Sequence, residues 1–113
     1  MHELHATQAI LEKALEKAAD GRATRITHVF IALGELSSYS GDSIQFYWDD
    51  LSRGTLAEGA SLHFRDVEAE LQCMACFKKY HPKDGEILCP TCGSTGAKIV
   101  AGEDFYLESI DID

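Results

Sequence analysis

All four cysteines of the chain lie in two Cys-x-x-Cys pairs, Cys73 with Cys76 and Cys89 with Cys92, and twelve residues separate the pairs. Two intervening residues let each pair turn tightly enough to place both sulfurs on one metal ion, and the amides of such a turn stabilise the thiolate charge. Gly93 follows the second pair, where the backbone needs a positive φ. The spacing therefore predicts a tetrathiolate metal site.

The identity of this metal is a separate question, because zinc and iron both accept four thiolates in a tetrahedron. The second half, Cys89-Pro-Thr-Cys92-Gly, also resembles the iron-binding knuckle of rubredoxin. We favour Zn²⁺, because the segment between the pairs is short and polar and would shield a redox centre poorly. A closed set of four protein ligands leaves no position for a substrate, so we expect structural zinc.

A second group of potential ligands stands at the start of the chain, Met1-His2-Glu3. The α-amine, the amide nitrogens and the His2 imidazole lie within chelating reach of one another, and Ni²⁺ and Cu²⁺ prefer such nitrogen-rich sets. A solvated histidine is the simpler interpretation, and both remain open. His5 follows one helical turn later and either assists the metal or lies on the surface. The other histidines, which lack ligand-like spacing, are expected to be structural or exposed: His28, His63 and His81.

Composition excludes several classes of function. The 113 residues suffice for one domain with a small metal-clamped module, and 45% hydrophobic residues can form a core. Ten basic residues are dispersed among nineteen acidic ones, with a net charge of −9, which argues against nucleic-acid binding. No apolar run is long enough for a membrane span, and no nucleophile, base and orienting group occur together, so we expect neither a membrane protein nor an enzyme.

The chain begins MHELHATQAI, which lacks the basic and apolar parts of a secretory leader. We therefore expect a cytoplasmic protein whose cysteines are reduced, although two disulfides are the third interpretation of the cysteine pattern.

The first half of the chain predicts two helices and a strand. Residues 1–20 show amphipathic helical spacing, and residues 24–36 alternate as a strand that Gly34 should end. Asp42 can cap a second helix that ends near residues 53–54.

The second half predicts two more strands and the metal module. Residues 61–71 alternate with a phase change near 65–66, which indicates a bulge, and residues 105–112 alternate with Tyr106, Ile110 and Ile112 on one face. The last strand is too exposed to stand alone and should pair with the first two. We therefore predict an α+β fold, a small three-stranded sheet with two helices plus an inserted zinc-ribbon module. Its domains are an α/β domain of residues 1–71, completed by the strand 98–113, and the zinc-ribbon domain 72–97.

Several motifs, in their order and spacing, resemble the HypA/HybF family of nickel-insertion proteins for hydrogenase maturation. They are Met1-His2-Glu3-Leu4, Leu33-Gly34-Glu35-Leu36, residues 51–55 and 57–60, the two Cys pairs, and Gly102-Glu103-Asp104-Phe105-Tyr106-Leu107. The resemblance covers the whole chain. Two positions depart from the family pattern: His5 stands where a small residue is frequent, and Phe77 replaces the glycine that often follows the first pair.

The resemblance implies a nickel metallochaperone that binds Ni²⁺ at its N-terminus on His2, with Met1 and Glu3 contributing, and delivers it for maturation of [NiFe] hydrogenase. It also implies structural Zn²⁺ on the four cysteines, a nickel-handling GTPase as partner, and the hydrogenase large subunit as recipient. Some members serve urease. We expect a monomer or a weak homodimer. The alternatives are a rubredoxin-like iron electron carrier and a zinc-ribbon adaptor protein.

Overall fold

The computed structural model describes the backbone of residues 2–83 and 86–113, and the side chains of these residues from Glu3 onward. The chain divides into two compact units. The first contains Met1–Ala32, Ser38–Arg65 and Phe105–Asp113, and the second contains Leu33–Ser37 and Asp66–Asp104. Two helices with a small three-stranded sheet and a cysteine-bearing insertion confirm the predicted α+β fold class.

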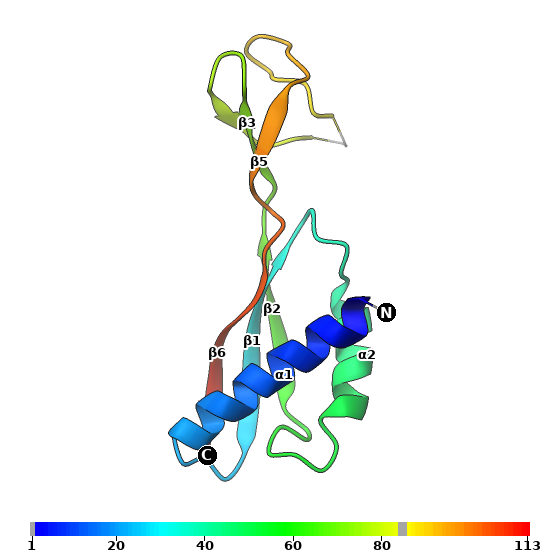
Figure 1. Ribbon diagram of the computed structural model, residues 1–113, viewed down its shortest axis with the longest axis vertical. Coiled ribbons are helices and arrows are strands. Elements are labelled where there is room, and N and C mark those ends of the chain that lie inside the picture. The colour runs from blue at the N-terminus through cyan, green and yellow to red at the C-terminus, as the bar shows by residue number, and fades with distance from the viewer. Residues whose placement is uncertain (1, 84–85) are drawn as a thin grey trace. The chain divides into compact units, whose positions relative to one another are not determined.

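Three strands form the sheet associated with the first unit, in the order β2-β1-β6 (Figure 1). They are β1 (Ile26–Gly34), β2 (Ser61–Val67) and β6 (Phe105–Ile112). Thr24 N donates to Asp113 O, and Thr27 Oγ1 donates to Asp111 O, so β6 runs antiparallel to β1. The last strand thus returns to the first one, as the sequence predicted.

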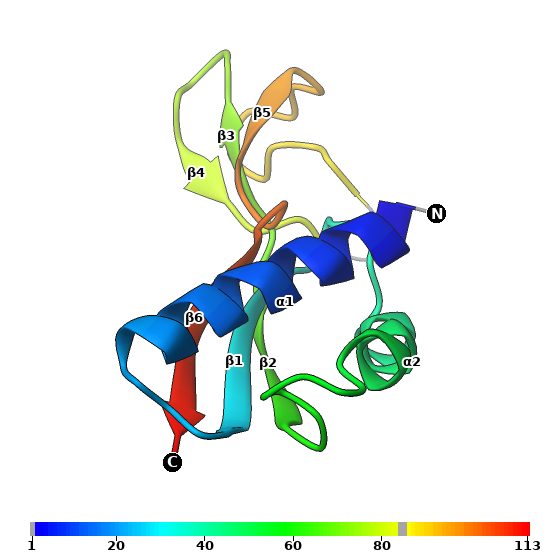
Figure 2. The ribbon, with the colours of Figure 1, turned by 60° about the horizontal axis from the view of Figure 1, so that its bottom comes forward.

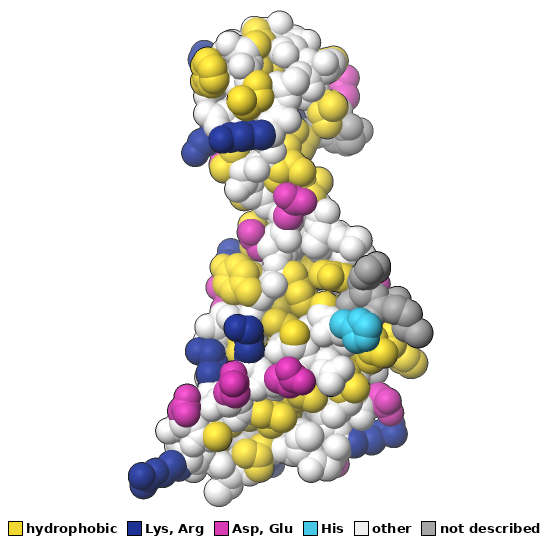
Figure 3. Space-filling model, viewed as in Figure 1, with side chains coloured by type: hydrophobic (Ala, Val, Ile, Leu, Met, Phe, Trp, Pro, Cys, Tyr) yellow, Lys and Arg dark blue, Asp and Glu magenta, His cyan; other side chains and the backbone are white. Residues whose placement is uncertain are grey.

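Two helices, α1 (His2–Asp20) and α2 (Gly41–Leu51), pack on this sheet and form the core with it (Figure 2). Every third or fourth residue of α1 is buried, while the opposite face carries Glu and Lys. Both signs of charge therefore appear on the unit that contains α1 (Figure 3). Trp48 of α2 is only 1% exposed and is the largest buried side chain. The core consists of Ile10, Leu11, Ala14, Ala18, Ile26, Val29, Ile31, Ile44, Trp48, Ala57 and Ala60.

The N-cap of the second helix lies two residues before the predicted one. Ser40 is the N-cap: its backbone is extended, and its hydroxyl oxygen accepts a hydrogen bond from Ser43 N at 3.2 Å. The prediction that Asp42 caps the helix is wrong, because Asp42 lies in the first turn, where its charge instead favours the positive end of the helix dipole. The helix ends at Leu51, two residues before the predicted end.

The predicted strand 61–71 is two strands that belong to different sheets. β2 ends at Val67, and β3 (Glu70–Cys73) is the central strand of a second sheet with β4 (Lys79–Tyr80) and β5 (Ala97–Ala101). Both neighbours run antiparallel to β3, which brings Leu71 opposite Tyr80 and Ile99. The sequence therefore missed the transfer between sheets that follows Val67, and the bulge near residues 65–66 stays a prediction.

A close backbone approach accompanies the transfer within the second unit. Leu36 N donates to Gly102 O at 2.6 Å, and a Cβ at Gly102 would lie only 2.7 Å from the Cα of Ala69. Gly102 also has a φ of 112°, which side chains rarely allow. Ala69 N, between the two strands, donates to a carboxylate oxygen of Glu35 at 2.9 Å.

The buried face of β6 differs from the prediction. Phe105, Leu107 and Ile110 pack against the core, whereas Tyr106 is 48% exposed and Ile112 is 39% exposed. The strict alternation expected of residues 106, 110 and 112 is therefore broken between residues 107 and 110.

The second unit has only a small core of its own, formed by Leu71, Cys73, Tyr80 and Cys89. The segment 72–97, for which the sequence predicted a separate zinc-ribbon domain, lies inside this unit, and its independent folding stays a prediction. None of the helices in the described part of the chain is long and apolar enough to cross a membrane.

Candidate functional site

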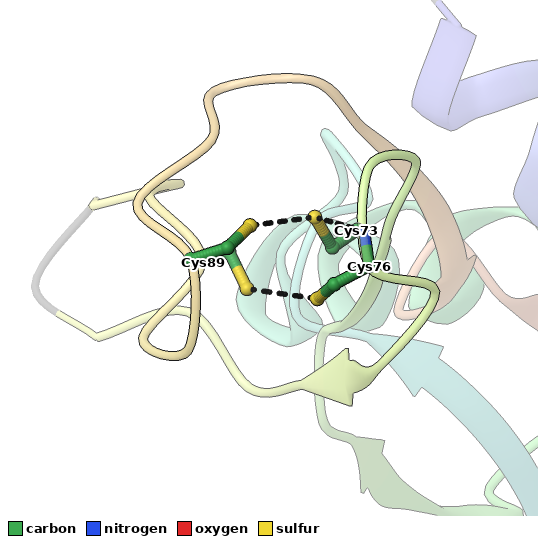
Figure 4. Close-up of side chains that lie close together, drawn as sticks. Cys73, Cys76 and Cys89 are labelled. Carbon is green, nitrogen blue, oxygen red and sulfur yellow. Dashed lines mark hydrogen bonds between the residues drawn. The ribbon is translucent and has the colours of Figure 1, made fainter.

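The four cysteine sulfurs converge on one point in the second unit. All four lie within 4.8 Å of one another, with Cys73 Sγ 3.5 Å from Cys92 Sγ and Cys76 Sγ 3.6 Å from Cys89 Sγ (Figure 4). A tetrahedral ion with metal–sulfur bonds of ~2.3 Å places its sulfurs ~3.8 Å apart. The spacing therefore fits a tetrathiolate ion such as zinc.

Two turns of similar geometry present these sulfurs. The first turn follows β3, and Phe77 N donates to Cys73 O at 2.9 Å. The second turn precedes β5, and Gly93 N donates to Cys89 O at 2.8 Å. Within the first turn, the amides of Ala75 and Cys76 both donate to Cys73 Sγ at 3.4 Å. These donors stabilise negative charge on the sulfur before any metal binds.

Hydrogen bonds from backbone amides and the crowding of the sulfurs give the thiols of Cys73, Cys89 and Cys92 different pKa values. The amide of Cys76, followed by that of Ala75, lowers the pKa of Cys73 to about 6. The amide of Cys92 likewise lowers the pKa of Cys89. The Ser94 amide acts in the same direction on Cys92, but the neighbouring thiol of Cys73 and burial outweigh it, so the pKa of Cys92 is raised to about 11. Negative charge on Cys73 and Cys89 therefore opposes ionisation of Cys92. A bound cation would neutralise this repulsion between thiolates.

Tyr80 packs with Cys73 and Cys89 in the small core of the second unit. Its ring is 8% exposed, and its hydroxyl donates to the carbonyl oxygen of Ile87. Burial raises the pKa of this phenol, and thiolate charge adds to the effect. Cys73 and Cys89 are buried, whereas Cys92 is exposed, so the cluster lies at the surface on one side.

The predicted nickel ligands fall partly outside the described residues. Met1 and the side chain of His2 lie outside them, while the His2 backbone begins α1. The first N–H groups of a helix have no partner within the helix. Thr7 Oγ1 donates to Glu3 O at 2.6 Å and reinforces the first turn.

The carboxylate of Glu3 already has a partner. Its Oε2 accepts a hydrogen bond from the backbone N–H of Ser40, the N-cap of α2, at 3.4 Å. The Glu3 side chain thus links the starts of the two helices. Because the carboxylate is engaged there, the backbone nitrogen is the simplest ligand that Glu3 can offer to a metal. His5 is exposed on α1.

One pair of histidines was missed by the sequence spacing. His28 of β1 and His63 of β2 stand side by side, with His28 Nδ1 2.9 Å from His63 Nε2. Their 35-residue separation gives no ligand-like motif, and only the pairing of the two strands brings them together. The sequence held one signal for this pair: each histidine alternates with apolar residues along its strand, which places both on the face of the sheet that points away from the core.

Comparison with known proteins identifies relatives across the full length. Residues 1–112 match the family model described as hydrogenase/urease nickel incorporation, metallochaperone, HypA. Hydrogenase maturation factor HypA of Caldanaerobacter subterraneus subsp. tengcongensis is 36% identical over 114 residues, with complete coverage of both chains. HypA of Geobacter metallireducens is 34% identical over 113 residues, again with complete coverage of both chains.

Two solved structures share the fold. The solution structure of a HypA protein superposes with a TM-score of 0.76 at 24% identity and covers 99% of this chain and 96% of that chain. The solution structure of the Ni metallochaperone HypA from Helicobacter pylori gives a TM-score of 0.70 at 21% identity, with 97% and 96% coverage.

Proposed function

Because the chain belongs to the HypA family of hydrogenase/urease nickel-incorporation metallochaperones, we propose that it binds Ni²⁺ at its N-terminus and delivers it for maturation of [NiFe] hydrogenase. The observation that carries the proposal is the full-length family match, joined to a terminal Met1-His2-Glu3. The ion would be held by the His2 imidazole, the α-amine of Met1, and amide nitrogens of His2 and Glu3.

The start of a helix imposes a condition on such a site. A cation there meets the positive end of the helix dipole, which costs on the order of 0.3–1 kcal/mol. Deprotonation of an amide nitrogen that binds the metal removes one of the N–H dipoles and adds negative charge, so it offsets this cost. The free amides at the first turn of α1 support a nitrogen-rich set, and the Glu3 carboxylate would support the site from outside through Ser40.

The second metal has a different role in the proposal. Zinc, held by Cys73, Cys76, Cys89 and Cys92, would supply folding energy to a unit with a small core. A closed thiolate cage retains its ion, whereas cargo must leave, so the two ions need separate sites. The sulfur spacing fits either ion, and the short polar loop between the pairs favours zinc over iron.

The proposed partners follow from the family description and from the sequence resemblance. The family description names hydrogenase and urease nickel incorporation, so the recipient would be a hydrogenase or urease. The resemblance further implies a nickel-handling GTPase that acts beside this protein and the hydrogenase large subunit as the specific recipient. We expect a monomer or weak homodimer in the cytoplasm, without catalytic activity or nucleic-acid binding of its own.

The experiment is a calorimetric Ni²⁺ titration of the untagged, zinc-loaded protein and of His2→Ala. The tight nickel-binding event should disappear in His2→Ala, while zinc content and the thermal transition stay unchanged. Glu3→Gln serves as the matched control, because glutamine keeps an acceptor for Ser40 N–H, and it should retain most of the affinity. Unchanged tight binding by His2→Ala would reject the site and favour the zinc-ribbon adaptor. Iron in place of zinc would favour the electron carrier.

A further inference from the structure

The sheet of the first unit has one face covered by helices and another that carries polar and aromatic side chains. Val29 and Ile31 of β1 pack into the core, so the alternate residues His28 and Phe30 point away from it. On β2, Leu62 and Phe64 pack against the core, which turns His63 to the same outer face. His28 is partly exposed and His63 is exposed, so solvent reaches both rings.

The two imidazoles face each other through single nitrogen atoms. His28 Nδ1 lies 2.9 Å from His63 Nε2, and the ring centroids are 5.0 Å apart. Two nitrogens bound to one metal ion at ~2.1 Å, with a right angle between the bonds, lie ~3.0 Å apart. The observed separation fits adjacent ligands on one ion as well as a hydrogen bond, and both rings would rotate to direct their lone pairs to the ion.

Proton placement does not oppose this arrangement. A neutral imidazole carries its proton on either ring nitrogen, so both rings can hold their protons on the outer nitrogens while the two facing nitrogens present lone pairs. Without a metal, one ring donates a hydrogen bond to the other.

The surroundings hold the pair in place and leave room for further ligands. Phe30 stacks on His63 with a centroid separation of 4.8 Å and an interplanar angle of 17°, which supports that ring on one side. A hollow of about 280 Å³ adjoins the pair, lined partly by Phe30, His63 and Glu108, and can hold water ligands. The nearby cation, Arg65, is paired with Glu108 at 2.9 Å, so its charge is largely compensated.

We propose that His28 and His63 form a second, two-histidine site for a borderline divalent ion, Ni²⁺ or Cu²⁺, on the open face of the sheet. Imidazole nitrogen is a preferred ligand of both ions, and the net charge of −9 favours cations. With two protein ligands and water in the other positions, the site binds more weakly than the N-terminal chelate and exchanges its ion readily. The inference stands on the strand geometry and does not depend on the N-terminal site.

The test is a Ni²⁺ titration of the untagged, zinc-loaded protein in four forms: wild type, His2→Ala, His63→Gln, and the double variant. Wild type should bind two Ni²⁺ ions, each single variant one, and the double variant none. His63→Gln should weaken the second site by about tenfold or more, because the lost ligand acted at a high effective concentration. His81→Gln, which removes a histidine of the second unit, is the control and should leave both sites intact.

A second measurement locates the ion without altering the pair. In His2→Ala protein, Ni²⁺ should broaden the NMR signals of the Phe30 ring before those of the Tyr80 ring. Cu²⁺ in the same protein should give electron spin echo modulation from two imidazoles. A stoichiometry unaffected by His63→Gln, or broadening confined to other residues, would overturn the second site. If His2→Ala loses the tight site and keeps the His28–His63 site, both proposals stand. If His63→Gln loses the second site while His2→Ala leaves tight binding unchanged, only the N-terminal proposal fails.

Discussion

Phe77 and Gly93 occupy equivalent positions, each immediately after the second cysteine of a pair, and both have a left-handed backbone, with φ of 63° and 75°. Each also donates its N–H to the carbonyl oxygen of the first cysteine of its pair. The two metal-binding turns thus require the same conformation, but only one of them uses glycine. Phe77 is 65% exposed, so its side chain gains little from packing to offset the strain.

Phe77→Gly should therefore stabilise the zinc-bearing unit. Relief of the left-handed strain, less the added chain entropy of glycine, is worth about 1 kcal/mol. This corresponds to roughly fivefold tighter zinc binding, measured by competition with a chelator of known affinity. The matched variant, Gly93→Ala, places a Cβ on the same conformation in the other turn and should weaken zinc binding. Weaker binding by Phe77→Gly would contradict the strain argument.

Removal of one zinc ligand should destabilise the second unit and leave the first unit folded. Cys92→Ala should strongly reduce amide-exchange protection in β3, β4 and β5, because their core is small and metal binding adds to its stability. Protection in α1, α2 and β1 should persist, because those elements share the larger core around Trp48. Exchange measured residue by residue decides this. Global loss of protection would show that the first unit cannot fold without the ribbon.

Zinc binding to the metal-free protein should release fewer than four protons at pH 7.5. With its pKa lowered to about 6, Cys73 is already ionised at this pH, and the lowered pKa of Cys89 acts in the same direction. Cys92, with a pKa of about 11, is protonated and must lose its proton. Below about pH 6, Cys73 is protonated in the free protein, so proton release and the pH dependence of zinc affinity should both increase.

Calorimetry in two buffers of different ionisation enthalpy counts these protons. Release of four protons at pH 7.5 would show that the turn amides do not stabilise the thiolates.

The parts of the fold that were predictable depend on local signals. The cysteine spacing anticipated the convergence of four sulfurs, the helical periodicity anticipated α1, and Gly34 marked the end of β1. The family resemblance, carried by motifs along the chain, is confirmed by the match over residues 1–112.

The parts that escaped prediction depend on contacts between distant segments. Residues 61–71 alternate with one phase change near 65–66, but the chain leaves one sheet for the next only after Val67, where Ala69 closely approaches Gly102. Ser40 and Asp42 are both good capping residues, so the sequence could not choose between them. The His28–His63 pair depends on the register of β1 and β2, which no spacing in the sequence reveals.

The most direct test of the nickel proposal is to block the α-amine of Met1 by acetylation and to titrate the zinc-loaded protein with Ni²⁺. Acetylation keeps every side chain, including that of His2, but removes the amine from the chelate. The tight nickel-binding event should be lost, the zinc content should stay unchanged, and Ni²⁺ binding at His28 and His63 should persist. Tight Ni²⁺ binding that is unaffected by acetylation would contradict the N-terminal site.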